Sequence, residues 1–233
     1  MIDGPKRIKP YLLTELPVDL TVRMKLLAGI DTTVPERHEK GDFDRNDRAE
    51  IYTIINALLI DPHLPIPLPA SVFHSDRPDI VVRSATSAIG IEIVEAVSQT
   101  TAAMDCERAL LPDAPEFHWA TKQLLGEGKK FAWEVRDMIS NNEPGEGFIG
   151  DGAVDWAKAM ANFVRRKMAT VSKPGFQRFE KNWLLVYDNW REPARDLEKA
   201  DIFLDGLLKE MTAFAIFDLI LVLDDARLSV FRA

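Results

Sequence analysis

Asp79 and Glu92 are the two residues whose types and spacing could do chemistry together. Each lies in a short apolar segment, and segments 78–83 and 89–97 are predicted to form neighbouring strands joined by a turn at 84–88. Two carboxylates presented from adjacent apolar strands cost free energy to desolvate, so they need a metal ion, a base or solvent as partner. The stretch therefore predicts a polar site, and Mg²⁺ (or Mn²⁺) is the cation that carboxylate oxygens favour.

Phosphodiester hydrolysis is the chemistry that such a pair of acids could serve. It needs a metal ion to activate water and to neutralise charge in the transition state, and a further cation to steady the attacking hydroxide. A third acid, Glu50, lies beside the apolar stripe of a helix that we expect to begin at Asp42 or Asp44 and to end near Leu59. We expect Glu50 to assist Asp79 and Glu92, although a lone glutamate on a helix face is also typical of ordinary solvent exposure.

The elements that must position these acids follow from apolar periodicity and from Pro and Gly punctuation. Their order, helix, three strands, helices, strand, helix, two strands, predicts a mixed α/β sheet with helices on both faces. Beyond the hairpin we expect the following elements: strand 70–74, helical 100–125 broken by Pro112 and Pro115, 129–139 open between helix and strand, loop 141–152, helix 153–171, strand 183–187, helix 193–214, strand 217–223 and strand 228–232.

Composition favours one domain with a peripheral arm. Residues 1–40 are rich in proline and charge with one plausible helix at 16–30, and residues 41–233 are expected to form a single α/β domain. The absence of an apolar run of about 20 residues argues against a membrane helix, and the N-terminus shows no secretory pattern. The single cysteine, Cys106, excludes an intrachain disulfide, so we expect a cytoplasmic protein.

The formal net charge of −8 argues against a protein that coats nucleic acid indiscriminately. One stretch differs, because residues 161–181 contain six basic residues and only one acidic residue, Glu180. A solvated helix face explains this stretch as well as a phosphate-binding surface does. If it binds nucleic acid, the residues expected to contact phosphates are Arg165, Arg166, Lys173 and Arg178.

Taken together, these residues resemble the PD-(D/E)xK superfamily, the restriction-endonuclease-like fold. Pro78-Asp79 matches the first half of the signature and Glu92 in GIEIVEA matches the second, while the helix of Glu50 precedes them where many members place another acid. The resemblance covers roughly residues 44–190 through short, degenerate motifs. It implies a restriction-endonuclease-like core, Mg²⁺ or Mn²⁺ held by Asp79 and Glu92, and a nucleic-acid substrate, with DNA ahead of RNA.

The sequence departs from the family signature at one position. The family pattern is Glu-x-Lys, but here the third residue is Val94. Some members move the lysine to a neighbouring helix, and Lys167, or with less support Lys158, is the candidate for that role. Without such a lysine, the resemblance implies a catalytically inactive module that binds nucleic acid or protein.

Other readings have less support. A third alternative is a structural protein of unrelated topology whose acids make hairpin salt bridges. His38, His63, His74 and His118 lack the spacing of a zinc site, the glycines near 145–152 lack the Lys of a phosphate-binding loop, and no GxSxG is present. Homodimerisation is an open expectation, since the aromatic residues Phe117, Trp119, Phe131 and Trp133 could form an interface or pack in a core.

Overall fold

A computed structural model describes residues 10–35, 44–111, 113–115, 123, 125–126, 128–142, 150–190 and 195–233. Over these residues the chain forms one seven-stranded mixed sheet and six α-helices, which confirms the predicted α/β class. The elements are β1 (Tyr11–Leu16), α1 (Leu20–Ala28), α2 (Asp44–Ile60), β2 (Ala70–His74), β3 (Ile80–Ser84), β4 (Ala88–Ala96), α3 (Gln99–Leu110), α4 (Ala132–Asn141), α5 (Gly152–Val171), β5 (Lys181–Asp188), α6 (Leu197–Glu210), a 3₁₀ turn (Ala213–Ala215), β6 (Leu219–Asp224) and β7 (Arg227–Phe231).

The strands lie side by side in chain order, β1 to β7. Strands β1 to β4 form an antiparallel meander, β4, β5 and β6 are parallel, and β7 returns antiparallel to β6. A parallel pair needs a crossover connection, and here α3, α4 and α5 connect β4 to β5 while α6 connects β5 to β6. The meander therefore carries the two acids, and the crossover brings α5 against them.

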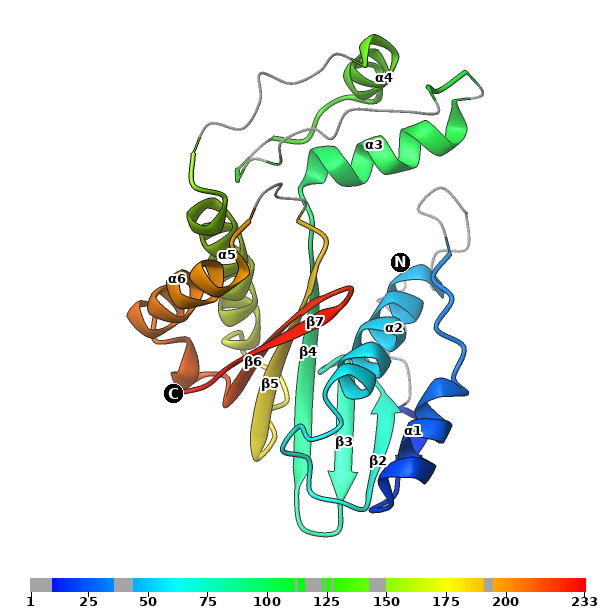
Figure 1. Cartoon of the computed structure of the whole chain (residues 1–233), viewed down its shortest axis with the longest axis vertical. Coiled ribbons are helices and arrows are strands. Elements are labelled where there is room, and N and C mark those ends of the chain that lie inside the picture. Colours follow the sequence, from blue (N-terminus) through cyan, green and yellow to red (C-terminus); the bar gives the residue numbers. More distant parts are fainter. Residues whose placement is uncertain are drawn as a thin grey trace.

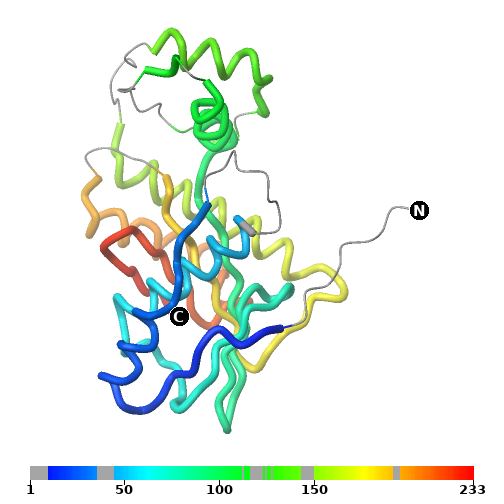
Figure 2. The backbone as a smooth tube through the Cα atoms, turned by 90° about the vertical axis from the view of Figure 1, so that its right-hand side faces the viewer, coloured from blue at the N-terminus to red at the C-terminus, as the bar shows by residue number. Residues whose placement is uncertain are grey.

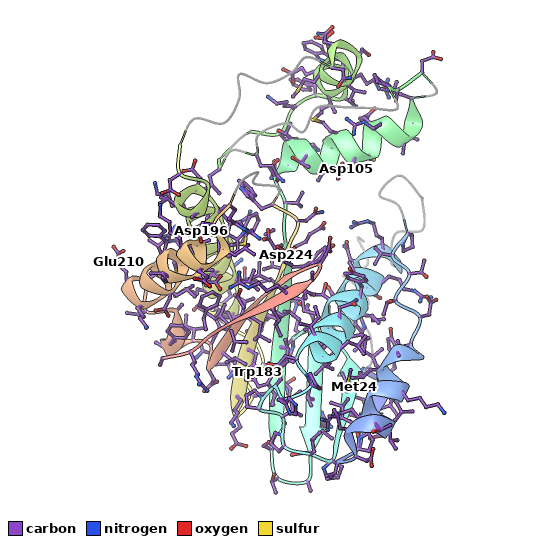
Figure 3. All side chains as sticks on the ribbon, in the orientation of Figure 1. Met24, Asp105, Trp183, Asp196, Glu210 and Asp224 are labelled. Atoms are coloured by element: carbon purple, nitrogen blue, oxygen red, sulfur yellow. The ribbon has the colours of Figure 1, made fainter. Side chains whose placement is uncertain are left out.

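Helices cover both faces of the sheet, with α1 and α2 on one side and α5 and α6 on the other (Figure 1). On the α2 side, Ile51, Ile54, Ile55 and Leu58 share a buried core with alternate residues of β3 and β4: Ile80, Val82, Ile89, Ile91 and Ile93. On the α5 side, Trp156, Met160 and Val164 share a second core with Leu184, Val186, Ile220 and Val222. Side chains fill the space between the sheet and both helical layers, with Trp183 of β5 among them (Figure 3).

Helices α3 and α4 lie beyond the end of the sheet toward which β4 runs (Figures 1 and 2). They have a small apolar cluster of their own, built from Met104, Val135 and Ile139. The segment 129–139, which the sequence left open, is helical from Ala132 onward. Phe131 and Trp133 are 70% and 68% exposed, whereas Phe117, Trp119 and most of the expected loop at 141–152 lie outside the described residues.

The N-terminal segment differs from expectation. The helix expected at 16–30 begins at Leu20, because the Asp19 side chain accepts a hydrogen bond from the backbone N–H of Val22 and caps it. Residues 11–16 form strand β1, which pairs with β2, and Leu16 is 1% exposed. The sequence did not predict this strand, because its stability depends on pairing with β2, about sixty residues later, rather than on a local pattern.

Candidate functional site

The hairpin of β3 and β4 places Asp79 and Glu92 side by side. Ile80, the first residue of β3, pairs with Ile91 of the antiparallel strand β4, so Asp79, just before Ile80, stands opposite Glu92, just after Ile91. Alternation directs Ile91 and Ile93 toward the α2 core, which leaves Glu92 on the α5 face together with Val94. The backbone N–H of Ile93 donates to Oδ2 of Asp79 at 2.6 Å and fixes this carboxylate.

Close packing behind the acids depends on Gly90. A Cβ at this position would lie 2.7 Å from Cδ2 of Phe179 and 2.9 Å from Cγ of Pro78. Glycine therefore lets Pro78 and Phe179 lie directly against β4. Because Pro78 immediately precedes Asp79, this contact helps to fix the position of the Asp79 backbone and of its carboxylate.

Lys167 of α5 supplies a cation to both acids. Its Nζ donates to Oε2 of Glu92 at 2.7 Å and lies 3.5 Å from Oδ2 of Asp79. The sequence had offered Lys167 and Lys158 as replacements for the lysine missing at Val94. The structure places Lys167 between the two acids, whereas Lys158 is exposed on the same helix.

Burial perturbs the proton affinities of this trio. Burial raises the pKa of Glu92 to about 7, with the Asp79 charge adding to the rise and Lys167 opposing it. Burial also raises the pKa of Asp79, against the opposing charge of Lys167 and the hydrogen bond from Ile93. For Lys167, burial acts to lower the pKa, but the two carboxylates outweigh it and the net shift is upward. The trio thus concentrates negative charge that a further cation would relieve.

The acids and Lys167 open into a cavity of about 370 Å³. Its lining residues are Asp76, Arg77, Asp79, Glu92, Lys167, Thr170, Lys173, Pro174, Gly175 and Phe176. Of the predicted phosphate contacts, Lys173 is part of this lining, and Arg178 borders an adjoining crevice with Glu92, Pro78 and Gly90. Arg165 and Arg166 are exposed on α5 and do not belong to the lining, and the Arg166 guanidinium lies 5.8 Å from the centre of the Phe163 ring.

Glu50 has a closer partner than the two acids it was expected to assist. Its Oε2 lies 2.9 Å from Nε2 of His74, the last residue of β2, and that nitrogen lies 4.0 Å from Oδ1 of Asp47. The three side chains offer ligand atoms that all lie within 4.8 Å of one another, so they could hold a metal ion. His74 is 1% exposed.

This second cluster and the first lie on opposite faces of the sheet. His74 follows Ala70 and Val72 at strand spacing, and both of these residues belong to the α2 core. The clusters still interact through charge: burial raises the pKa of Glu50, and the charge of Asp79 adds to the rise. For His74, burial lowers the pKa, but the hydrogen bond and charge of Glu50 outweigh it and raise the value overall.

Sequence reasoning missed Asp47, His74, Arg77 and Thr170 as site residues. Asp47 and Glu50 are three residues apart on one helix face, a signal that was readable, but their partner His74 lies 24 residues beyond Glu50 and shows no ligand spacing. Of the other histidines, His63 is exposed, and His38 and His118 lie outside the described residues.

Comparison with models of known protein families, with curated proteins and with solved structures finds no match to this chain. Within the part of the chain that the structure describes, no helix is long and apolar enough to cross a membrane. A proposal for function therefore has to rest on the geometry of the chain itself.

Proposed function

We propose that this protein is a metal-dependent nuclease that hydrolyses phosphodiester bonds of nucleic acid, with DNA ahead of RNA as the expected substrate. The observation that carries the proposal is the position of Lys167, whose ammonium lies beside both Glu92 and Asp79 although it comes from a helix 75 residues downstream of Glu92. Two acids and one ammonium at the wall of one cavity are the groups that this chemistry requires.

The order of elements around the site supports the same proposal. Helix α2, the β2–β3–β4 meander, helix α5 and the parallel strand β5 come in the order expected for a restriction-endonuclease-like core, with α3 and α4 inserted between β4 and α5. The remaining strands, β1 on one edge and β6 and β7 on the other, extend the sheet outside that unit. Fold resemblance alone does not imply activity, so we infer catalysis from the trio of Asp79, Glu92 and Lys167.

The two acids fit a hard divalent cation. Among the described residues, the hydrogen bonds of Asp79 and Glu92 use only Oδ2 and Oε2, which leaves the second oxygen of each carboxylate for a ligand. Mg²⁺ is usually bound by one or two carboxylates together with water and substrate phosphate. Asp79 and Glu92 would hold the ion, which supplies water activation and charge neutralisation, while Lys167 steadies the attacking hydroxide.

Basic groups near the cavity suggest how a polyanion would approach. Arg77, which comes just before β3, and Lys173, which comes just after α5, both line the cavity. Arg178 borders the adjoining crevice. These three side chains would bind phosphates next to the acids, and Arg165 and Arg166 would extend the contact along the exposed face of α5.

Cleavage assays test the proposal. The wild-type protein is expected to nick DNA in the presence of Mg²⁺ or Mn²⁺ but not in EDTA, and the single variants Asp79→Asn, Glu92→Gln and Lys167→Met are expected to lose at least about a hundredfold in rate. Double- and single-stranded DNA and RNA should all be offered. Cleavage that survives both acid substitutions would come from a contaminant or another site and would overturn the proposal.

One observation favours an inactive relative of the same fold as the second candidate. Lys167 pairs directly with both carboxylates, so the protein already neutralises part of the charge that a metal would balance. In that case the chain would bind nucleic acid or protein without cutting. Salt-sensitive DNA binding that is weakened by Lys173→Ala and Arg178→Ala, together with no cleavage under any metal, would support the inactive module over the nuclease.

A further inference from the structure

We propose that Asp47, Glu50 and His74 form a separate binding site for a first-row transition metal such as Zn²⁺. The proposal does not rest on the nuclease proposal, because it concerns other side chains on the other face of the sheet. It rests on the geometry of the three groups, on the burial of the imidazole and on ligand chemistry.

The spacing of the ligand atoms suits one ion. Nε2 of His74 lies 2.9 Å from Oε2 of Glu50 and 4.0 Å from Oδ1 of Asp47. Metal–ligand bonds of about 2.0–2.2 Å place neighbouring ligand atoms roughly 3–3.5 Å apart. Shifts of less than about 1 Å in two carboxylates would thus bring all three atoms into a coordination sphere, with the remaining positions open to water or a ligand.

Regular secondary structure holds the three ligands. Asp47 and Glu50 lie one turn apart on α2, whose apolar stripe packs against the sheet. His74 is hydrogen-bonded between two strands, since it pairs with Tyr11 of β1 and with Ile80 of β3. The Tyr11 ring packs beside the imidazole with the ring centres 5.3 Å apart. Ligands on a helix and on a strand that is paired on both sides are better fixed than ligands on loops.

Exposure gives an ion a way in. The side chains of Asp47 and Glu50 are 25% and 23% exposed, while His74 is 1% exposed. The two carboxylates therefore lie between solvent and the buried imidazole. An ion could approach through the acids and displace the hydrogen bond between Glu50 and His74.

The donor set determines the class of metal. Imidazole nitrogen suits Zn²⁺, Cu²⁺, Fe²⁺ and Ni²⁺, whereas Mg²⁺ and Ca²⁺ prefer oxygen ligands throughout. Two carboxylates balance the charge of a divalent ion. Nδ1 of His74 has no hydrogen-bond partner among the described residues, whereas Nε2 faces the Glu50 carboxylate, so a metal ion at Nε2 would replace the proton shared with Glu50. We therefore expect selectivity for transition metals over Mg²⁺ here, in contrast to the all-carboxylate pair Asp79 and Glu92.

Direct binding of Zn²⁺ tests the proposal without reference to cleavage. Isothermal titration of chelator-treated, tag-free full-length protein should show one Zn²⁺ site that millimolar Mg²⁺ does not displace. Removal of a ligand should weaken binding by at least the roughly tenfold to hundredfold that loss of an outer-sphere partner costs. His74→Gln and Asp47→Asn are the two variants, with circular dichroism as the check on folding.

Two matched variants serve as controls. His63→Gln removes an exposed histidine of the same chemistry, so it should not change Zn²⁺ affinity by more than about threefold. Asp79→Asn removes an acid that acts on this cluster only through its charge, so its effect should be smaller than that of Asp47→Asn. Asp47 is partly exposed, so Asp47→Asn is expected to fold even if His74→Gln does not. The proposal is overturned if the wild type does not bind Zn²⁺, if Asp47→Asn binds as tightly as the wild type, or if Asp79→Asn is the variant that loses binding.

Discussion

Lys167 sets the charge balance of the candidate site. One ammonium lies between two buried carboxylates, and its side chain is 19% exposed against 15% for Asp79 and 7% for Glu92. Removing one member of a buried ion pair costs more than the pair itself contributes, because the partners remain buried without compensation. The lysine should therefore matter for folding as well as for any reaction.

We predict that Lys167→Met lowers the free energy of unfolding by about 2–4 kcal/mol at pH 8 and by less at pH 5, where the acids can take up protons. Urea denaturation in EDTA measures both values. Lys158→Met is the matched control, since that lysine is exposed on the same helix and should change stability by less than about 0.5 kcal/mol. Equal effects of the two substitutions would contradict the charge-balance argument.

The raised pKa of Glu92 predicts that the free energy of unfolding falls as the pH rises. Its pKa in the folded protein is raised from 4.5 to about 7, so the folded state holds a proton that the unfolded state releases. The resulting stabilisation is fully present below pH 4.5 and is lost as the pH rises through about 7.

Unfolding free energy in EDTA should consequently fall between these pH values with a slope of up to about 1.4 kcal/mol per pH unit from this group. Glu92→Gln should flatten the slope, because the amide does not titrate. Parallel curves for the wild type and the variant would show that Glu92 ionises normally.

At the scale of elements, the β3–β4 hairpin depends on the missing side chain of Gly90. We predict that Gly90→Ala costs about 1–3 kcal/mol, because the added methyl group would press on Phe179 and on Pro78 beside Asp79. Gly206→Ala in α6 is the control: a Cβ there meets no atom within 4 Å, so the substitution should be neutral or stabilise by up to about 1 kcal/mol. Thermal unfolding of both variants distinguishes overpacking from a general effect of alanine.

Elements with a strong local pattern could be predicted from the sequence, and elements that depend on distant partners could not. The apolar stripe of α5 and the continuous apolar run of β5 indicated a covered helix and a central strand, and the structure contains both. Strand β1 could not be predicted from a local pattern, because it is defined by its pairing with β2.

The same distinction holds within the candidate site. Asp79 and Glu92 stood out because charged residues are rare inside apolar strands, and the valine at position 94 directed attention to Lys167. Asp47 and His74 had no such signal. Their proximity follows from how α2 packs on the sheet, which no short motif encodes.

For the molecule as a whole, the question is whether the N-terminal strand belongs to the same cooperative unit as the rest. Leu16 is 1% exposed in the α2-side core, whereas Leu12 on the same strand is 50% exposed. We predict that Leu16→Ala lowers the free energy of unfolding by about 2–4 kcal/mol within a single transition, and that Leu12→Ala costs less than about 1 kcal/mol. A separate early transition in Leu16→Ala would show that β1 melts independently.

The position of Lys167 on the crossover helix also has a consequence for the order in which the protein assembles. The hairpin with both acids is complete by residue 96, but its ammonium lies 75 residues beyond Glu92 and reaches the acids only after α5 has docked on the sheet. During synthesis, a nascent chain that has emerged only through β4 therefore carries two repelling carboxylates without the ammonium of Lys167. The hairpin should pack tightly only after α5 has been synthesised and has docked on the sheet. The site would therefore be completed late, when the fold around it is nearly formed.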